Sequence, residues 1–194
     1  MTAPVDVCNW ALLRLGQARV SSIDPPFTTD PAGIAATCSF LYPLVRDAEL
    51  RAHAWTFAKA RVQIAAEIDA PEFGYAHKYR KPADFARLVA APDDAGQEAD
   101  LLPEGEFILS DLPAPLDCVY VRTGVDASEF DPLFTAALSC SLALNLAEKI
   151  TTSPAKKESI DKDYGRIVSQ AKLTNSIEQP AQKPPEDDFV LVRR

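Results

Sequence analysis

The stretch from Pro132 to Ala147 contains no charged residue, and it limits the possible folds more than any other part of the sequence. Its apolar residues fall on two sides of a helix. One side carries Leu133, Ala137, Cys140, Leu144 and Ala147, and the other carries Phe134, Leu138, Leu142 and Leu146. A helix that is apolar on most sides has to be covered on most sides. We therefore predict a central helix over Pro132–Ile150 that is surrounded by other elements.

Two helices are predicted in the N-terminal third of the chain. The first covers Pro4–Leu15, because proline suits a first helical turn and Gly16 follows as an end signal. The second is expected to begin with Asp30 as N-cap and Pro31 as its first residue. Its apolar stripe recurs in steps of three and four residues as far as Trp55, so we expect one long amphipathic helix. Within it, Pro43 removes a backbone hydrogen bond, which predicts a kink.

A last helix is predicted over Pro154–Leu173. Ser153-Pro154 repeats the cap-then-proline signature that Asp131-Pro132 shows at the start of the central helix. Charged residues occupy most of its sides, so it should pack by one face only. That face consists of Ile160, Tyr164, Ile167 and Ala171.

The middle of the chain has a different pattern, with short apolar runs bounded by Pro, Gly or Asp. Such runs predict a small antiparallel sheet. The candidate strands are His77–Arg80, Phe85–Val89, Glu106–Ser110 and Leu116–Arg122. The expected fold class is therefore α+β, a helical bundle with an inserted antiparallel β lobe and an extended C-terminal arm. The expected divisions are residues 1–70 and 126–174 for the bundle, 71–125 for the lobe and 175–194 for the arm.

Charge and composition exclude several classes of protein. The net charge of -8 is opposite to the basic balance with which proteins hold nucleic-acid phosphates. No uninterrupted apolar run reaches the roughly 18–20 residues that cross a bilayer, and the N-terminus lacks the pattern of a signal peptide, so we expect no membrane. Four cysteines occur outside any C-x-x-C pair, and we expect buried free thiols in a reducing cytoplasm. A disulfide or metal framework is the alternative for Cys8, Cys38, Cys118 and Cys140.

The sequence contains no recognisable catalytic or cofactor motif. Its two histidines, His53 and His77, lie in different predicted elements and outside any metal-ligand spacing. The glycines form no phosphate-binding loop, and the acidic pairs Asp93-Asp94 and Asp187-Asp188 lie in a loop and in the arm, where charges are normally solvated. We therefore predict no catalytic residue, no metal site and no cofactor. Aromatic residues at helical spacing are expected in the core, among them Trp10, Trp55, Phe40 and Phe57.

From Asn175 onward the sequence becomes polar and rich in proline, and it ends in a short β-prone run. One interpretation is a frayed terminus. The other is a tether whose end adds a strand to a neighbour or fills its groove. The candidate partner-binding residues are Phe189, Val190, Leu191, Val192, Arg193 and Arg194.

Several segments, in this order and spacing, resemble the tail tubular protein A family of short-tailed phages. The opening helix ends in Ala11–Gly16 and is followed by the turn Ser22–Asp24, and Ala48–Lys59 carries a tryptophan and a phenylalanine after the long helix. The remaining segments are Phe73–Asp84, Ala114–Arg122, Phe130–Leu138 and Ala147–Ser153. Together they span most of residues 4–173, and the arm lies outside the resemblance.

The resemblance implies an α+β protomer in a head-to-tail connector, the adaptor below the portal protein of a tailed bacteriophage. It implies a homo-oligomeric ring, typically a dodecamer, bound to the portal above and to a tail or nozzle protein below. It implies no catalysis and no cofactor, a place at the head–tail interface of the virion, and synthesis in the host cytoplasm. An acidic ring suits this role, because DNA has to slide through the channel without being held.

Two alternatives remain open. Another connector component, such as a stopper or a tail terminator, would also be an oligomeric interaction protein. An α+β enzyme or small-ligand binder without a recognisable motif would instead require polar groups that converge in a deep pocket.

Overall fold

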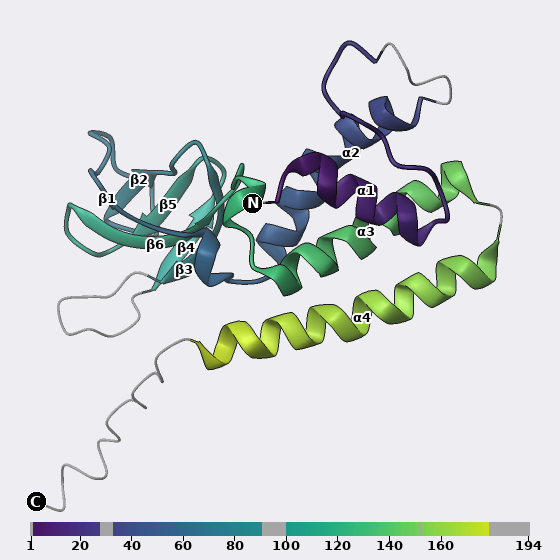
Figure 1. Ribbon diagram of the computed structural model, residues 1–194. Helices are drawn as coiled ribbons and strands as arrows, with labels where there is room; N and C mark the ends of the chain where they lie inside the picture. Colours follow the sequence, from purple (N-terminus) through teal and green to yellow (C-terminus); the bar gives the residue numbers. More distant parts are fainter. Residues whose placement is uncertain (1, 28–32, 91–99, 152, 179–194) are drawn as a thin grey trace, which may run out of the picture.

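Helix α3 (Pro132–Ile150) lies against all three of the other helices, which confirms the predicted central helix. These helices are α1 (Pro4–Arg14), α2 (Ile34–Ala52) and α4 (Pro154–Ile177) (Figure 1). The computed structural model describes residues 2–27, 33–90, 100–151 and 153–178. Four helices and two small antiparallel sheets make up these residues, so the fold class is α+β.

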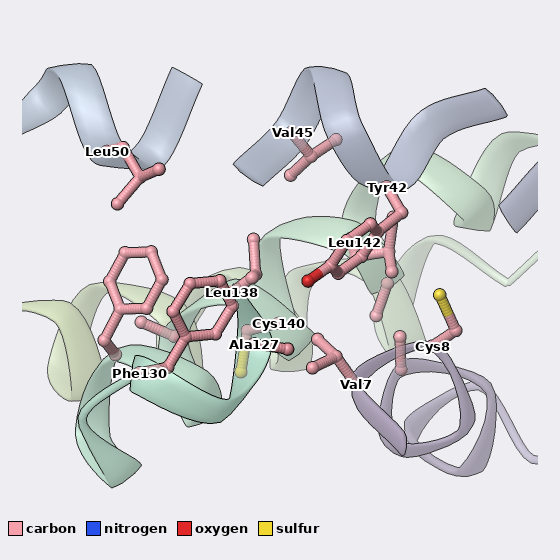
Figure 2. Close-up of a cluster of buried hydrophobic side chains, with 14 of the residues drawn as sticks. Val7, Cys8, Tyr42, Val45, Leu50, Ala127, Phe130, Leu138, Cys140 and Leu142 are labelled. Atoms are coloured by element: carbon pink, nitrogen blue, oxygen red, sulfur yellow. The ribbon is translucent and has the colours of Figure 1, made fainter. Parts of the chain in front are cut away.

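The core of the helical part forms where α1, α2 and α3 face one another. Figure 2 shows Val7 from α1 and Val45 from α2 beside Leu138 and Leu142 from α3. Leu138 and Leu142 are fully buried. Since burial of one leucine side chain is worth about 1.5–3 kcal/mol, α3 contributes a large part of the folding free energy.

Helix α3 is also the one described helix that is long and apolar enough to cross a membrane by length and composition. In the folded chain, 61% of its most apolar 18-residue window is buried. The packing of α1, α2 and α4 around it therefore accounts for its composition as that of a core helix.

Three predicted helix starts, at Pro4, Pro132 and Pro154, are confirmed and one is wrong. The side chain of Asp131 accepts hydrogen bonds from the backbone of Leu133 and Phe134 at the start of α3, and Ser153 caps α4. Helix α2 starts later than predicted, at Ile34, where Gly33 is the N-cap with a left-handed φ of 63°. A residue without Cβ adopts this backbone readily, so glycine rather than Asp30 sets the start. Asp30-Pro31 lies outside the described residues.

The C-terminal end of α2 also differs from the prediction. The helix passes through Pro43 and ends at Ala52, three residues before Trp55. Trp55 instead precedes a short 3-10 helix, η1 (Thr56–Ala58), that leads into the β lobe. Trp55 is buried although it lies in the turn after the helix. The apolar spacing in the sequence therefore extends past the true end of the helix.

The β lobe contains two three-stranded antiparallel sheets where one was expected. The first has the order β1-β6-β3 and the second β2-β5-β4. The four predicted strands are present as β2 (His77–Arg80), β3 (Phe85–Ala90), β5 (Phe107–Ser110) and β6 (Leu116–Arg122). The two strands that the sequence did not predict are β1 (Lys59–Ile64) and β4 (Leu101–Glu104).

Each missed strand has a local reason. Strand β4 contains Pro103, which argues against a strand, yet β4 lies at the edge of its sheet where proline is tolerated. Strand β1 pairs with β6 from Lys59 to Ile64, before the residue at which the lobe was expected to begin. A second, smaller core fills the space between the sheets and includes Tyr79, Ile108 and Leu116.

Helix α4 packs by one face, as predicted, with Ile160, Ile167 and Ala171 buried. The expectation that folded structure ends at Asn175 is wrong, because α4 continues to Ile177. Asn175 is itself buried, and its side chain is held by the segment that follows α2. Asn175 thus makes a tertiary contact and does not mark the start of the arm.

The predicted burial of the cysteines is confirmed, whereas the predicted burial of the aromatic residues is only partly correct. All four cysteines are buried thiols outside any disulfide. Trp55 is buried and Phe57 half-buried, but Trp10 is 40% and Phe40 69% exposed, so the core prediction is wrong for these two. Helical spacing groups residues on a face without showing which face meets the core.

Candidate functional site

The described residues bring no catalytic constellation together. No group of three or more His, Cys, Asp or Glu side chains within them could hold a metal ion. His53 is the C-cap of α2, whereas His77 begins β2 in the other half of the molecule. The two acidic pairs of the sequence, at 93–94 and 187–188, lie outside the described residues.

His53 takes part in a hydrogen-bond cluster that joins α4 to the end of α2. Asn175 Oδ1 accepts from the backbone N–H of Thr56 at 2.8 Å, which fixes the orientation of the amide. Its Nδ2 therefore donates to the carbonyl of Ala54 at 3.3 Å and to Nε2 of His53 at 3.1 Å. An Nε2 that accepts a hydrogen bond belongs to a neutral imidazole. Burial, together with nearby basic side chains, lowers the pKa of His53, in agreement with this state.

Glu49 is a buried carboxylate that the sequence did not single out. It lies on α2 at 7% exposure and accepts hydrogen bonds from the hydroxyl of Tyr164 on α4, at 2.9 and 3.1 Å. Burial, and secondly the Glu49 carboxylate, raises the pKa of Tyr164 above its usual range. The Glu49–Tyr164 pair joins α2 to α4.

One pocket, of about 310 Å³, lies where the C-terminal end of α4 meets the start of α3. We call it the α4-end pocket. Three separate stretches of the chain line it, because α4 brings its last turn against the segments before β1 and before α3. The lining residues are Trp55, Thr56, Phe57, Glu129, Phe130, Asp131, Ala171, Thr174, Asn175 and Glu178.

The floor of the α4-end pocket is aromatic. Trp55 stacks on Phe57 with ring centroids 6.2 Å apart, and Phe57 lies 5.8 Å from Phe130. Phe134, behind them, meets Phe57 edge to face at 5.0 Å. Such contacts hold the rings in fixed positions, so the pocket presents a rigid apolar surface.

Carboxylates surround this aromatic floor. Glu129, Asp131 and Glu178 contribute three acidic side chains to the lining, and no Lys or Arg of the described residues is part of it. Asp131 is already engaged as the cap of α3, and Glu129 pairs with Arg122 at 2.5 Å. Glu178 is exposed at the C-cap of α4. The pocket therefore combines an apolar interior with negative charge at its edge.

Large apolar side chains are also exposed on the outer faces of three helices. Phe40 and Leu44, one turn apart on α2, are 69% and 56% exposed, and we call them the α2 face. Trp10 and Leu13 are exposed on α1, and Leu173 and Ile177 on α4. Spacings of three and four residues place the two members of each pair side by side. Single exposed apolar residues are ordinary, whereas these pairs place two large apolar side chains together on one helix face.

The predicted partner-binding residues Phe189–Arg194 lie outside the described residues, so their contacts stay a prediction. The described chain ends at Glu178, which is part of the α4-end pocket. Comparison with known protein-family models and with curated protein sequences finds no match to this chain.

Proposed function

We propose that this chain is a structural subunit of a tailed bacteriophage, a head-to-tail adaptor that forms a ring below the portal. The observation that carries the proposal is the set of exposed apolar pairs on the outer faces of α1, α2 and α4. The resemblance in sequence to tail tubular protein A supports the same role. The partners would be other copies of the chain, the portal protein and a downstream tail or nozzle protein.

A closed ring requires two different faces on each subunit, because every copy meets its two neighbours through unlike surfaces. The α2 face and the Leu173–Ile177 pair lie on different helices and supply two such surfaces. Complete burial of a Phe or Leu side chain is worth about 1.5–3 kcal/mol. Each contact thus adds affinity in small amounts, and closure of the ring sums them around the assembly.

The charge of the chain supports the same proposal. At a net charge of -8, the subunit repels the phosphate backbone. A channel built from such subunits would let DNA pass without binding a particular sequence, since no counterions are exchanged for Lys or Arg contacts. The same charge keeps free subunits soluble before they meet the portal.

The alternative of an enzyme or small-ligand binder has less support. Two polar residues of the α4-end pocket already have structural partners: Asp131 caps α3, and Asn175 binds three groups of the chain. A stopper or tail terminator stays a second candidate within the connector class, because exposed apolar helix faces suit any of these oligomeric proteins.

The proposal is tested by the mass of the purified protein, alone and mixed with a cognate portal ring, by native mass spectrometry. We expect a ring, or a monomer that assembles on the portal. A monomer that ignores the portal at all concentrations would refute the proposal.

A substitution locates the contact. Phe40→Asp on the α2 face should prevent assembly, while Phe73→Asp, at an 86% exposed site between β1 and β2 of the β lobe, serves as the matched control. Both variants should keep the helical circular dichroism of the original chain. Equal assembly of the two variants would show that the α2 face is not the contact.

A further inference from the structure

We propose that the α4-end pocket receives the C-terminal segment Phe189–Arg194 of a neighbouring copy, with Phe189 in the aromatic interior and the two arginines at the acidic edge. This inference rests on the proposed ring, and it names the site where one subunit holds the next. Three independent features of the chain support it: the chemistry of the pocket, the chemistry of the segment, and the distance between them.

The interior of the pocket suits an aromatic side chain. The Phe57 ring centroid lies 6.2 Å from that of Trp55 and 5.8 Å from that of Phe130, within the range in which aromatic rings pack favourably. Phe57 is half-buried, whereas Trp55 and Phe130 are buried, so Phe57 offers most of the aromatic surface. A volume of about 310 Å³ is at the lower end of the range for ligand sites, so it suits one or two side chains rather than a whole peptide. Phe189 is the only aromatic residue of the sequence after Tyr164.

Charge complementarity favours the same segment. Three carboxylates line the pocket, and the described chain places no Lys or Arg among them. Glu129 pairs with Arg122 and Asp131 caps α3, so the exposed Glu178 is the carboxylate left to meet an arginine. The segment carries two arginines and no acidic side chain. Arg193 follows Phe189 by four residues, about 13 Å in an extended chain, which allows the arginines to reach the edge while Phe189 occupies the interior. Arginine also binds carboxylates through two parallel hydrogen bonds.

Chain length favours a neighbour over the same subunit. Ten residues, 179–188, separate Glu178 from Phe189, and they include Pro180, Pro184 and Pro185. Proline-rich stretches favour extended backbone of about 3.1 Å per residue, so ten residues cover roughly 30 Å. That length is about the diameter of a small domain. Because the pocket lies beside Glu178 itself, such a stretch would carry Phe189 away from its own pocket and toward the next one.

The test uses full-length chains. The receiving chain carries Phe189→Ala, Arg193→Glu and Arg194→Glu, so its own segment cannot compete. It also carries Trp10→Phe, which leaves Trp55 in the pocket as the only tryptophan. The probe is a synthetic hexapeptide of residues 189–194. We expect saturable binding that changes the emission of Trp55.

Two matched substitutions locate the binding site. Glu178→Lys at the exposed pocket edge should weaken binding by about threefold or more, because the charge reversal replaces attraction to the arginines with repulsion. The control is Glu104→Lys, the same charge reversal on the exposed edge strand β4. Since Glu178 is the C-cap residue, a lysine there favours the helix and should not disturb folding. A peptide with Phe189→Ala should show no binding.

The outcomes separate the inference from the proposed function. Absence of binding, or binding that Glu178→Lys and Phe189→Ala leave unchanged, would overturn the inference. In a chain that keeps its own Phe189–Arg194, a change in Trp55 emission that is independent of protein concentration would also overturn the inference. The segment would then occupy the pocket of its own subunit. If rings still form on the portal in any of these cases, the adaptor function stands and only the inference fails.

Discussion

The hydrogen bonds between Tyr164 and Glu49 allow one effect on stability to be worked out in detail. Tyr164→Phe removes the hydroxyl that donates to both carboxylate oxygens of Glu49, at 2.9 and 3.1 Å, and leaves the ring in place. Glu49 is 7% exposed, so water cannot fully replace the lost donor. Hydrogen bonds to charged groups contribute about 1.5–3 kcal/mol. We expect Tyr164→Phe to lower the free energy of unfolding by this amount.

Urea unfolding followed by far-ultraviolet circular dichroism measures the change, with the slope m unchanged between variants. In a Glu49→Gln background the acceptor is neutral, and the same loss should shrink to about 0.5–1.5 kcal/mol. Tyr75→Phe is the control, because its hydroxyl makes no hydrogen bond to another described residue; it should shift stability by less than about 0.5 kcal/mol. An equal effect of Tyr164→Phe in both backgrounds would refute the assignment of the energy to the Glu49 carboxylate.

Four further predictions follow from single residues. The buried hydroxyl of Tyr42 has no partner among the described residues, so Tyr42→Phe should raise stability by up to about 1–3 kcal/mol in urea unfolding; a loss would contradict this. Asp131→Ala removes the cap of α3 and should cost about 1 kcal/mol in the same assay, against no change for an exposed Asp117→Ala control. The pKa of His53 is lowered in the folded chain, so on acidification the unfolded chain takes up a proton before the folded chain does. The free energy of unfolding should therefore fall as the pH drops below about 6.5, and His53→Gln should reduce this dependence on pH. Burial, together with a hydrogen bond to Asp84, raises the pKa of Tyr120 to about 12. As the pH rises, the unfolded chain loses this proton before the folded chain does, so the free energy of unfolding should fall between about pH 10 and 12. The fall should be smaller in Tyr120→Phe.

Much of the helical part could be predicted from the sequence because its signals are local. The absence of charge from Pro132 to Ala147 required a covered helix, and the side chains of Asp131 and Ser153 bind backbone groups two or three residues away. Strands β2 and β6 were predicted with their observed bounds, since turn residues mark their ends. In each case the chemistry that decides the structure lies within a few residues.

Predictions failed where a distant segment decided the outcome. Strand β1 exists because it pairs with β6, more than fifty residues later in the chain. Phe40 and Trp10 follow helical spacing, but their exposure depends on where α3 lies. Asn175 looked like the start of the arm, yet its amide binds groups at the end of α2.

The candidate site, too, was decided by segments that are distant in the sequence. The α4-end pocket is lined from three stretches that are far apart in sequence, and neither its aromatic floor nor its acidic edge forms a motif. The sequence by itself determined the fold class, the central helix and the arm's composition, because composition and short-range hydrogen bonding act within one segment. Only the tertiary structure decided which apolar residues stay exposed and where carboxylates gather, because packing brings side chains together without regard to their order in the chain.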